Sequence, residues 1–224
     1  MKKLKTYASL LFTMVLICSI SYAQDNLTSI DLSKVGDSNN WEVFNRKVSI
    51  GNENDDVVMH FNTQPGDGFA RLKNREFTNG IIEADIKGKD VQGNSFVGIA
   101  FRGVNDSTFD AVYFRPFNFL STDSIRRSHS VQYISQPIYT WSKLRREFTG
   151  EFEKQIDNPP DPNSFFHVKI VIEKPRISVF VNDATKPCLV VNELSNRTGG
   201  WVGLWVGNYS EGTFANLKIH EMKK

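Results

Sequence analysis

Apolar and polar residues alternate along most of the chain. The alternation is clearest in the run Ile81-Ile82-Glu83-Ala84-Asp85-Ile86-Lys87. Alternation of this kind is typical of β-strands. It predicts strands at 41–43, 57–61, 70–72, 81–87, 95–102, 111–117, 165–173, 176–182, 187–192, 200–206 and 213–220. Turn pairs such as Asn79-Gly80 separate them, so we expect an all-β fold, a single antiparallel β-sandwich of two sheets.

One stretch departs from this pattern. Residues 139–153 show no alternation, and they allow a short helix near Ser142-Lys143-Leu144-Arg145. The preceding residues 128–141 are rich in aromatic and polar side chains, and loops of this composition often cap binding clefts. Tyr133, Tyr139 and Trp141 are therefore expected to line a cleft wall or to fold the loop onto a sheet.

Alternation also assigns residues to the two faces of each strand. The core-like positions are 97, 99 and 101, 112 and 114, and 202, 204 and 206. The opposite faces of the same strands carry residues that a core does not need, namely Arg102, Tyr113, Arg115, Trp201 and Trp205. Sugar rings stack on Trp and Tyr, and sugar hydroxyls accept hydrogen bonds from Arg. This face is therefore a candidate ligand site, with Asn118 and Gln132 at its edge.

The same residues have a purely structural interpretation. Trp201 and Trp205 could pack beneath the segment 120–165, and each Arg could pair with a nearby acid such as Asp110. Aromatic–Arg stacking serves packing as well as binding. The sequence leaves both interpretations open.

The amino terminus has the features of a secretory signal. Lys2, Lys3 and Lys5 precede an apolar run from Leu10 to Ile20, and Ser21-Tyr22-Ala23 is a cleavage pattern. Cleavage after Ala23 would leave 201 of the 224 residues and, with three lysines removed, would change the net charge from +2 to −1. Near-neutrality argues against a nucleic-acid partner. We expect a secreted or periplasmic protein, and no later run is long enough for a membrane span.

The two cysteines have separate interpretations. Cys18 could carry a lipid anchor, although Ile17 before it is a poor fit, so simple cleavage is favoured. Cys188 would then be the one cysteine left, which excludes an intramolecular disulfide. It lies in an apolar run and is expected to be a small buried hydrophobic residue.

Metal and nucleotide sites find little support. The run Asn52-Glu53-Asn54-Asp55-Asp56 is rich in oxygen ligands and could hold a structural Ca²⁺, but a polar hairpin tip is the better interpretation. The sequence has no zinc spacing, P-loop, dinucleotide fingerprint or Gly-x-Ser-x-Gly motif. We therefore expect no cofactor.

The order of several motifs resembles a known superfamily. These motifs are 77–86, 96–102, Tyr113-Phe114-Arg115, 200–207 and 213–219. The chain resembles the concanavalin A-like lectin/glucanase jelly roll over residues 25–222. It is most similar to laminin-G-like and 3-keto-disaccharide hydrolase type domains of secreted bacterial proteins. The resemblance implies a glycan-related role, and the fold by itself does not choose between binding and catalysis.

Three residues are candidates for catalysis. Family 16 glucanases of this fold carry Glu-x-Asp-x-x-Glu on the concave face, and Glu83-x-Asp85 matches its first part. Lys87, Gly88 and Lys89 follow, so the third carboxylate is missing and a solvated strand face is the simpler interpretation. His129 could act as a general base, but it has no visible orienting partner.

The residues favour a secreted carbohydrate-binding protein that holds a poly- or oligosaccharide on its concave face. A glycoside hydrolase or polysaccharide lyase of the same fold is the alternative, and a protein-interaction domain of the cell envelope is the third. The sequence names neither the sugar nor the oligomeric state.

Overall fold

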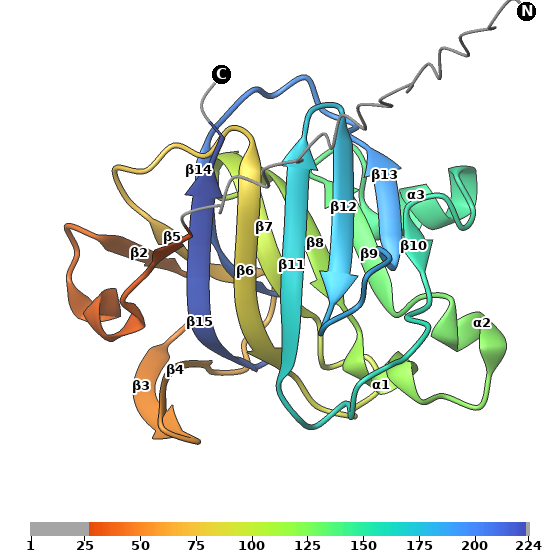
Figure 1. Cartoon of the computed structure of the whole chain (residues 1–224), viewed down its shortest axis with the longest axis horizontal. Coiled ribbons are helices and arrows are strands. Elements are labelled where there is room, and N and C mark those ends of the chain that lie inside the picture. Colours follow the sequence, from red (N-terminus) through yellow and green to blue (C-terminus); the bar gives the residue numbers. More distant parts are fainter. Residues whose placement is uncertain (1–26, 223–224) are drawn as a thin grey trace, which may run out of the picture.

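The structure is a computed structural model that describes residues 27–222. The predicted signal peptide, its cleavage site and Cys18 lie outside the described residues. One sheet of a two-layer sandwich lies in front of the other in Figure 1. None of the described helices is long and apolar enough to cross a membrane.

The first sheet has the strand order β13-β12-β11-β6-β15-β4-β3, and β1 pairs with β15. Its strands are β1 (Thr28–Ser29), β3 (Val48–Glu53), β4 (Asp56–Phe61), β6 (Gly80–Lys87), β11 (Phe166–Glu173), β12 (Arg176–Val181), β13 (Leu189–Asn192) and β15 (Gly212–Glu221). All its pairs are antiparallel. β6 pairs with β11 on one side and with β15 on the other, so segments far apart in sequence form the centre of this sheet.

The second sheet has the order β10-β9-β8-β7-β14-β5-β2 and is also antiparallel. Its strands are β2 (Trp41–Phe44), β5 (Gly68–Leu72), β7 (Val97–Asn105), β8 (Thr108–Phe114), β9 (Val131–Ser135), β10 (Glu153–Lys154) and β14 (Trp201–Val206). The predicted all-β, two-sheet antiparallel sandwich is confirmed.

The core fills the space between the two sheets. Ile82 on the first sheet and Ile99, Val112 and Leu204 on the second are completely buried. Phe114 of β8 meets Phe166 of β11 edge to face, with ring centroids 5.2 Å apart. Ile99, Val112, Phe114 and Leu204 are positions that alternation assigned to the core. The burial of such apolar side chains provides most of the stability of a fold of this size.

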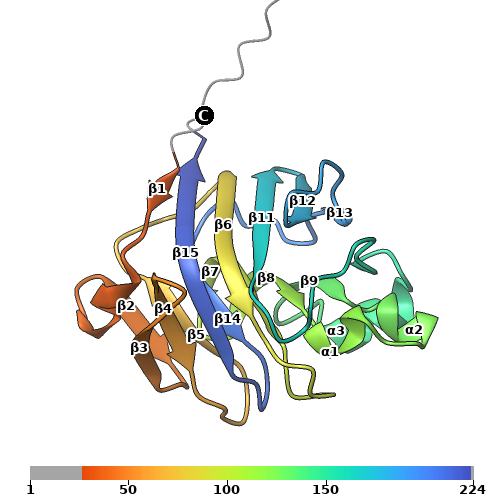
Figure 2. The same cartoon turned by 60° about the horizontal axis from the view of Figure 1, so that its bottom comes forward.

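The helices are short. A 3₁₀ turn, η1 (Leu32–Gly36), lies near the first strands, whereas α1 (Pro116–Phe119), α2 (Ser124–Arg127) and α3 (Trp141–Glu147) gather beside β8 and β9 (Figure 2). The side chains of Asp123 and Thr140 cap α2 and α3. The helix expected near residue 143 is confirmed as α3. The predicted strand end at 115–117 is instead the start of α1, because Pro116 takes the first helical position.

Four strands were not predicted, and two of them, β1 and β10, are only two residues long. β9 lies in the segment expected to be a loop, and all five of its residues are buried. A strand covered on both faces has no reason to alternate apolar with polar residues, so its pattern was not recognised. β3 was missed for the opposite reason, since most of its side chains are exposed or half-buried.

Candidate functional site

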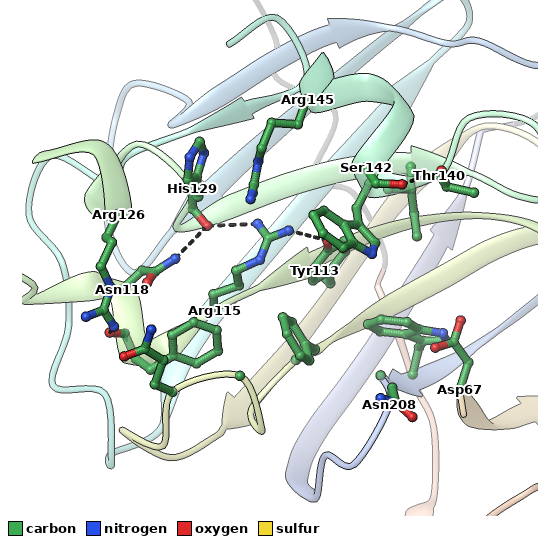
Figure 3. Close-up of a pocket in the computed structure, with 18 of the residues that line it drawn as sticks. Asp67, Tyr113, Arg115, Asn118, Arg126, His129, Thr140, Ser142, Arg145 and Asn208 are labelled. Atoms are coloured by element: carbon green, nitrogen blue, oxygen red, sulfur yellow. Dashed lines mark hydrogen bonds between the residues drawn. The ribbon is translucent and has the colours of Figure 1, made fainter. Parts of the chain in front are cut away.

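A pocket of about 540 Å³ opens on the outer face of the second sheet, under the segment that contains α1, α2 and α3. The strand register shows that this is the outer face. Trp205 and Tyr113 both lie opposite Gly98, whereas their neighbours Leu204, Ile99 and Val112 point into the core. Residues from the sheet and the helical segment line the pocket together (Figure 3); they include Asp67, Phe96, Tyr113, Arg115, Phe117, Asn118, Arg126, His129, Trp141, Ser142, Arg145, Trp205 and Asn208.

Aromatic rings form the floor of the pocket. The rings of Tyr113 on β8 and Trp205 on β14 lie 5.2 Å apart across β7. Gly98 makes this approach possible, since a Cβ there would lie 2.2 Å from the Val112 carbonyl oxygen and 2.6 Å from the Tyr113 Cα. Phe96 meets Tyr113 edge to face at 6.1 Å. Tyr113 is 2% and Trp205 is 4% exposed, so these packed rings give the pocket an apolar base.

Arg115 is held rigidly beside this floor. Its guanidinium donates to the His129 carbonyl oxygen at 2.9 Å, to the Tyr113 hydroxyl at 2.5 Å and to the Gln132 side-chain carbonyl. The residue is only 4% exposed. Burial raises the pKa of Tyr113 to about 12, so the phenol keeps its proton at neutral pH and acts as a hydrogen-bonding group.

Glu153 is the anionic centre behind the pocket wall. It lies on β10, opposite Gln132 of β9, and is 2% exposed. Arg145 donates two hydrogen bonds to its carboxylate, at 2.9 and 2.7 Å. His129 Nδ1 lies 3.0 Å from Glu153 Oε1, and Arg115 Nη1 lies 3.7 Å from Oε2. One buried carboxylate thus positions three side chains that line the pocket.

The same contacts set the protonation of His129. Burial lowers its pKa below the ordinary value, and Arg145 and Arg115 lower it further, while Glu153 opposes this shift. The imidazole is therefore neutral at pH 7. Glu153 is the orienting partner of His129 that the sequence did not reveal.

The carboxylate of Asp67 lies at the other end of the pocket, near Asn208 (Figure 3). Burial raises the pKa of Asp67 to about 6, while Arg46 and the indole N–H of Trp205 lower it in part. The indole N–H and the carboxylate do not meet at hydrogen-bonding geometry. The indole nitrogen is buried, so of the two groups only the Asp67 carboxylate, which lines the pocket, can meet a ligand hydroxyl.

The structure brings together most of the predicted site residues. Tyr113, Arg115, Asn118, Trp205 and the candidate base His129 all line the pocket. Gln132 lies just beneath the surface and holds Tyr113 and Arg115 in place. Their roles toward a ligand stay predictions.

The aromatic residues of segment 128–141 take different positions. Trp141 lines the pocket, as one interpretation expected, and is 50% exposed. Tyr133 instead points into the sandwich, where its hydroxyl donates to Asp110 at 3.2 Å. Tyr139 packs against the edge of the core and does not line the pocket.

Trp201 lies on the predicted face but away from the pocket. Its ring stacks on Phe69 at 4.7 Å and meets Phe109 at 5.7 Å. The guanidinium of Arg71 lies 5.4 Å from the Trp201 ring. Trp201 thus belongs to a packed aromatic cluster. The structural interpretation was right that this residue packs, but its partners are Phe69 and Phe109 and not the segment 120–165.

The predicted position of Arg102 on the open face is wrong. A bulge interrupts the pairing of β7 with β8 after Phe101, and Arg102 takes a positive φ of 50°. Its side chain therefore turns into the sandwich, donates to the Thr78 carbonyl oxygen at 2.9 Å and pairs with buried Glu193. Alternation fails at a bulge because the extra residue reverses the following side chains.

Asp110 was suggested as the acid partner of an Arg on this face. Its buried carboxylate instead pairs with Arg197 at 2.6 Å and accepts a hydrogen bond from Ser195 at 2.9 Å. Arg102 does pair with a buried acid, but that acid is Glu193. The structural interpretation was therefore right about Arg102 and wrong about its partner.

Glu83 and Asp85 share one face, as alternation predicts, but they lie on β6 of the opposite sheet from the pocket. Asp85 Oδ1 lies 2.7 Å from His167 Nδ1, and Asn216 donates to Asp85 Oδ2 at 2.8 Å. Burial raises the pKa of Asp85, but these hydrogen bonds outweigh it and lower the pKa below its ordinary value. The sheet order thus keeps both of these catalytic candidates away from the pocket and from His129.

Several pocket residues were not predicted, above all Asp67, Arg126 and Arg145. Arg126 donates a hydrogen bond to the Phe117 carbonyl oxygen at 3.4 Å. The capping residues Asp123 and Thr140 were the available signals, because each marks the start of a short helix that presents one of these arginines.

Metal binding finds no support within residues 27–222. No group of three or more His, Cys, Asp or Glu side chains there is placed to hold an ion. Asn54 and Asp55, at the centre of the oxygen-rich run, have positive φ angles and form the turn between β3 and β4.

Comparison with known proteins relates the chain to solved structures. No family model matches it, and no curated protein sequence matches it. The carbohydrate-binding module CBM66 from Bacillus subtilis superposes with a TM-score of 0.59 at 18% identity, covering 81% of this chain and 96% of the module. The exoplasmic/lumenal domain of VIP36 gives 0.52 at 12% identity, covering 82% and 84%.

A third similar structure is a glycoside hydrolase family 16 endo-glucanase from Bacteroides ovatus. It superposes with a TM-score of 0.54 at 12% identity, covering 82% of this chain and 95% of the enzyme. At these identities the likeness establishes the fold. The more specific resemblance to laminin-G-like and 3-keto-disaccharide hydrolase type domains stays a prediction. The chain has the concanavalin A-like lectin/glucanase fold, an antiparallel jelly-roll sandwich.

Proposed function

We propose that this protein is an exported carbohydrate-binding protein that holds a glycan in the pocket on the outer face of its second sheet. One observation carries the proposal. The Tyr113–Trp205 floor and the fixed guanidinium of Arg115 meet in a single open pocket of about 540 Å³. Aromatic rings next to oriented hydrogen-bond donors are what recognition of a sugar requires.

The similar structures support the same conclusion. Their printed names include a carbohydrate-binding module and a domain in a Man3GlcNAc-bound form. The apolar groups of this pocket are already in contact with one another, so a ligand would meet a largely pre-formed surface. Pre-formed sites bind without a large ordering cost.

The arrangement of carboxylates favours binding over hydrolysis. Most glycoside hydrolases place two carboxyl groups on either side of the scissile bond. Within the described part of the chain, Asp67 is the one carboxylate that lines the pocket, and Glu153 is buried behind Arg145. One observation favours the enzymatic alternative. The contact with Glu153 gives the neutral imidazole of His129 a fixed orientation.

The test is a binding screen of the protein lacking residues 1–23 against a polysaccharide panel, followed by calorimetry. We expect binding to at least one glycan, and about a tenfold loss of affinity in Trp205→Ala, because this change removes the apolar base of the pocket. Trp201→Ala is the matched control, because this Trp shares the face but not the pocket. Equal losses in both variants, or no binding to any glycan, would contradict the proposal.

The enzymatic alternative is tested with the same substrates. Release of reducing ends or of unsaturated products, abolished in His129→Ala, would establish catalysis. Binding without any product establishes a binding protein.

A further inference from the structure

Positive charge gathers at one end of the pocket. Arg115, Arg126 and Arg145 all line the end formed by α1, α2 and α3 (Figure 3). The buried carboxylate of Glu153 pairs with Arg115 and Arg145. Three guanidinium groups and one carboxylate leave a formal charge of +2, since His129 is neutral at pH 7. Asp67 lies at the opposite end, beside Trp205.

These arginines keep donors for a ligand. Arg145 uses its Nε and one terminal nitrogen on Glu153, and its side chain remains 32% exposed. Arg126 forms no ion pair with any described residue, and its one hydrogen bond goes to the Phe117 carbonyl oxygen. A guanidinium carries five N–H donors, so each of these two arginines has free N–H groups.

Their positions are fixed by separate structural features. The Asp123 carboxylate caps α2 by accepting from the Ile125 amide at 2.8 Å, which places Arg126. The bidentate contact with Glu153 places Arg145. Each of these guanidinium groups can pair with an anionic group, because planar guanidinium forks match a carboxylate.

We propose that the pocket selects an acidic glycan, whose uronic acid carboxylates lie at the end of the pocket lined by Arg126 and Arg145 while its sugar rings extend toward the Tyr113–Trp205 floor. This inference rests on the proposed function and narrows it to one ligand class. Neutral sugars would leave the cationic end of the pocket without a counter-charge. A carboxylate would neutralise it and bring its own hydrogen-bond acceptors.

The experiment compares matched ligands. Tetragalacturonate and tetramannuronate are each titrated beside the carboxyl-reduced tetrasaccharide, with a sulfated neutral tetrasaccharide as a third arm. We expect at least one uronide to bind about tenfold more tightly than its carboxyl-reduced partner, which is the size of one charge-assisted contact. The preference should shrink as salt is raised, because exposed charges are screened.

Two variants locate the effect. Arg126→Gln should lose about tenfold in affinity for the uronide and leave binding of the carboxyl-reduced sugar unchanged. Arg146→Gln is the control, since Arg146 lies on α3 next to Arg145 but faces solvent, with 66% of its side chain exposed. It should change neither affinity.

The outcomes separate the two proposals. Equal affinity for both members of each pair, or binding of neutral glycans alone, overturns the acidic-glycan inference and leaves the proposed function standing. Tighter binding of the sulfated sugar than of any uronide overturns the assignment of a carboxylate. If no glycan binds, both proposals fail.

Discussion

Arg145 on α3 donates two hydrogen bonds to the carboxylate of Glu153 on β10, at 2.9 and 2.7 Å. This contact attaches the helical segment to the edge of the second sheet. His129 Nδ1 lies 3.0 Å from the same carboxylate, which therefore supports the pocket wall from two directions. The form of the pocket depends on a residue that does not line it.

Removal of this carboxylate should destabilise the fold. Glu153→Ala leaves Arg115 buried without its anionic neighbour, and loss of one member of a buried ion pair costs about 3 kcal/mol. Urea unfolding measures the change. Glu147→Ala on α3, whose side chain is 42% exposed, should change stability by less than about 1 kcal/mol. Similar stabilities of the two variants would show that Glu153 does not anchor the wall.

Trp141 should contribute to binding and little to stability. Its side chain is half exposed at the pocket rim, so Trp141→Ala is expected to weaken glycan binding about fivefold to tenfold. The melting temperature should stay within about 2 °C of the parent. Ile138→Ala removes an exposed apolar residue that does not line the pocket and should leave affinity unchanged.

The ionised carboxyl group of Asp67 should lower the free energy of unfolding at neutral pH. Its pKa is raised from 3.8 to about 6 in the folded protein, so the folded state holds this proton more tightly than the unfolded chain does. The cost appears as pH rises above 3.8, grows until about pH 6, and is constant above that.

Asp67→Asn should therefore stabilise the protein by about 1–3 kcal/mol at pH 7.5 and have little effect at pH 3.5. Denaturant unfolding at the two pH values measures the difference. Asp183→Asn, at an exposed carboxylate, is the control. An equal effect of Asp67→Asn at both pH values would contradict the assigned pKa shift.

Arg102 should matter for folding and not for binding. Arg102→Met leaves the buried Glu193 without its guanidinium partner, which should cost about 3–5 kcal/mol. The folded fraction should bind glycan with parental affinity, since Arg102 does not line the pocket. The double variant Arg102→Met/Glu193→Leu should recover part of the lost stability. If Arg102→Met lost affinity for the glycan without losing stability, Arg102 would have to belong to the ligand site.

Alternation predicted most of the strands because side-chain direction reverses at every residue of a regular strand. It correctly placed Tyr113 and Trp205 on the face opposite to Leu204 and Val112. It failed at Arg102, where a bulge adds a residue, and at β9, where both faces are buried. In both places, the alternation of apolar and polar residues no longer indicates which face of the strand is buried.

The sequence by itself determined the sandwich, its core positions and the face that carries Tyr113 and Trp205, because these follow from local periodicity. Only the tertiary structure decided which carboxylates and arginines meet. Asp67 reaches the pocket from the loop before β5, and Arg145 is fixed by Glu153 across the edge of the sheet. Strand order placed Glu83 on the opposite sheet. Such pairings depend on long-range register and on the burial of charge, which no local pattern encodes.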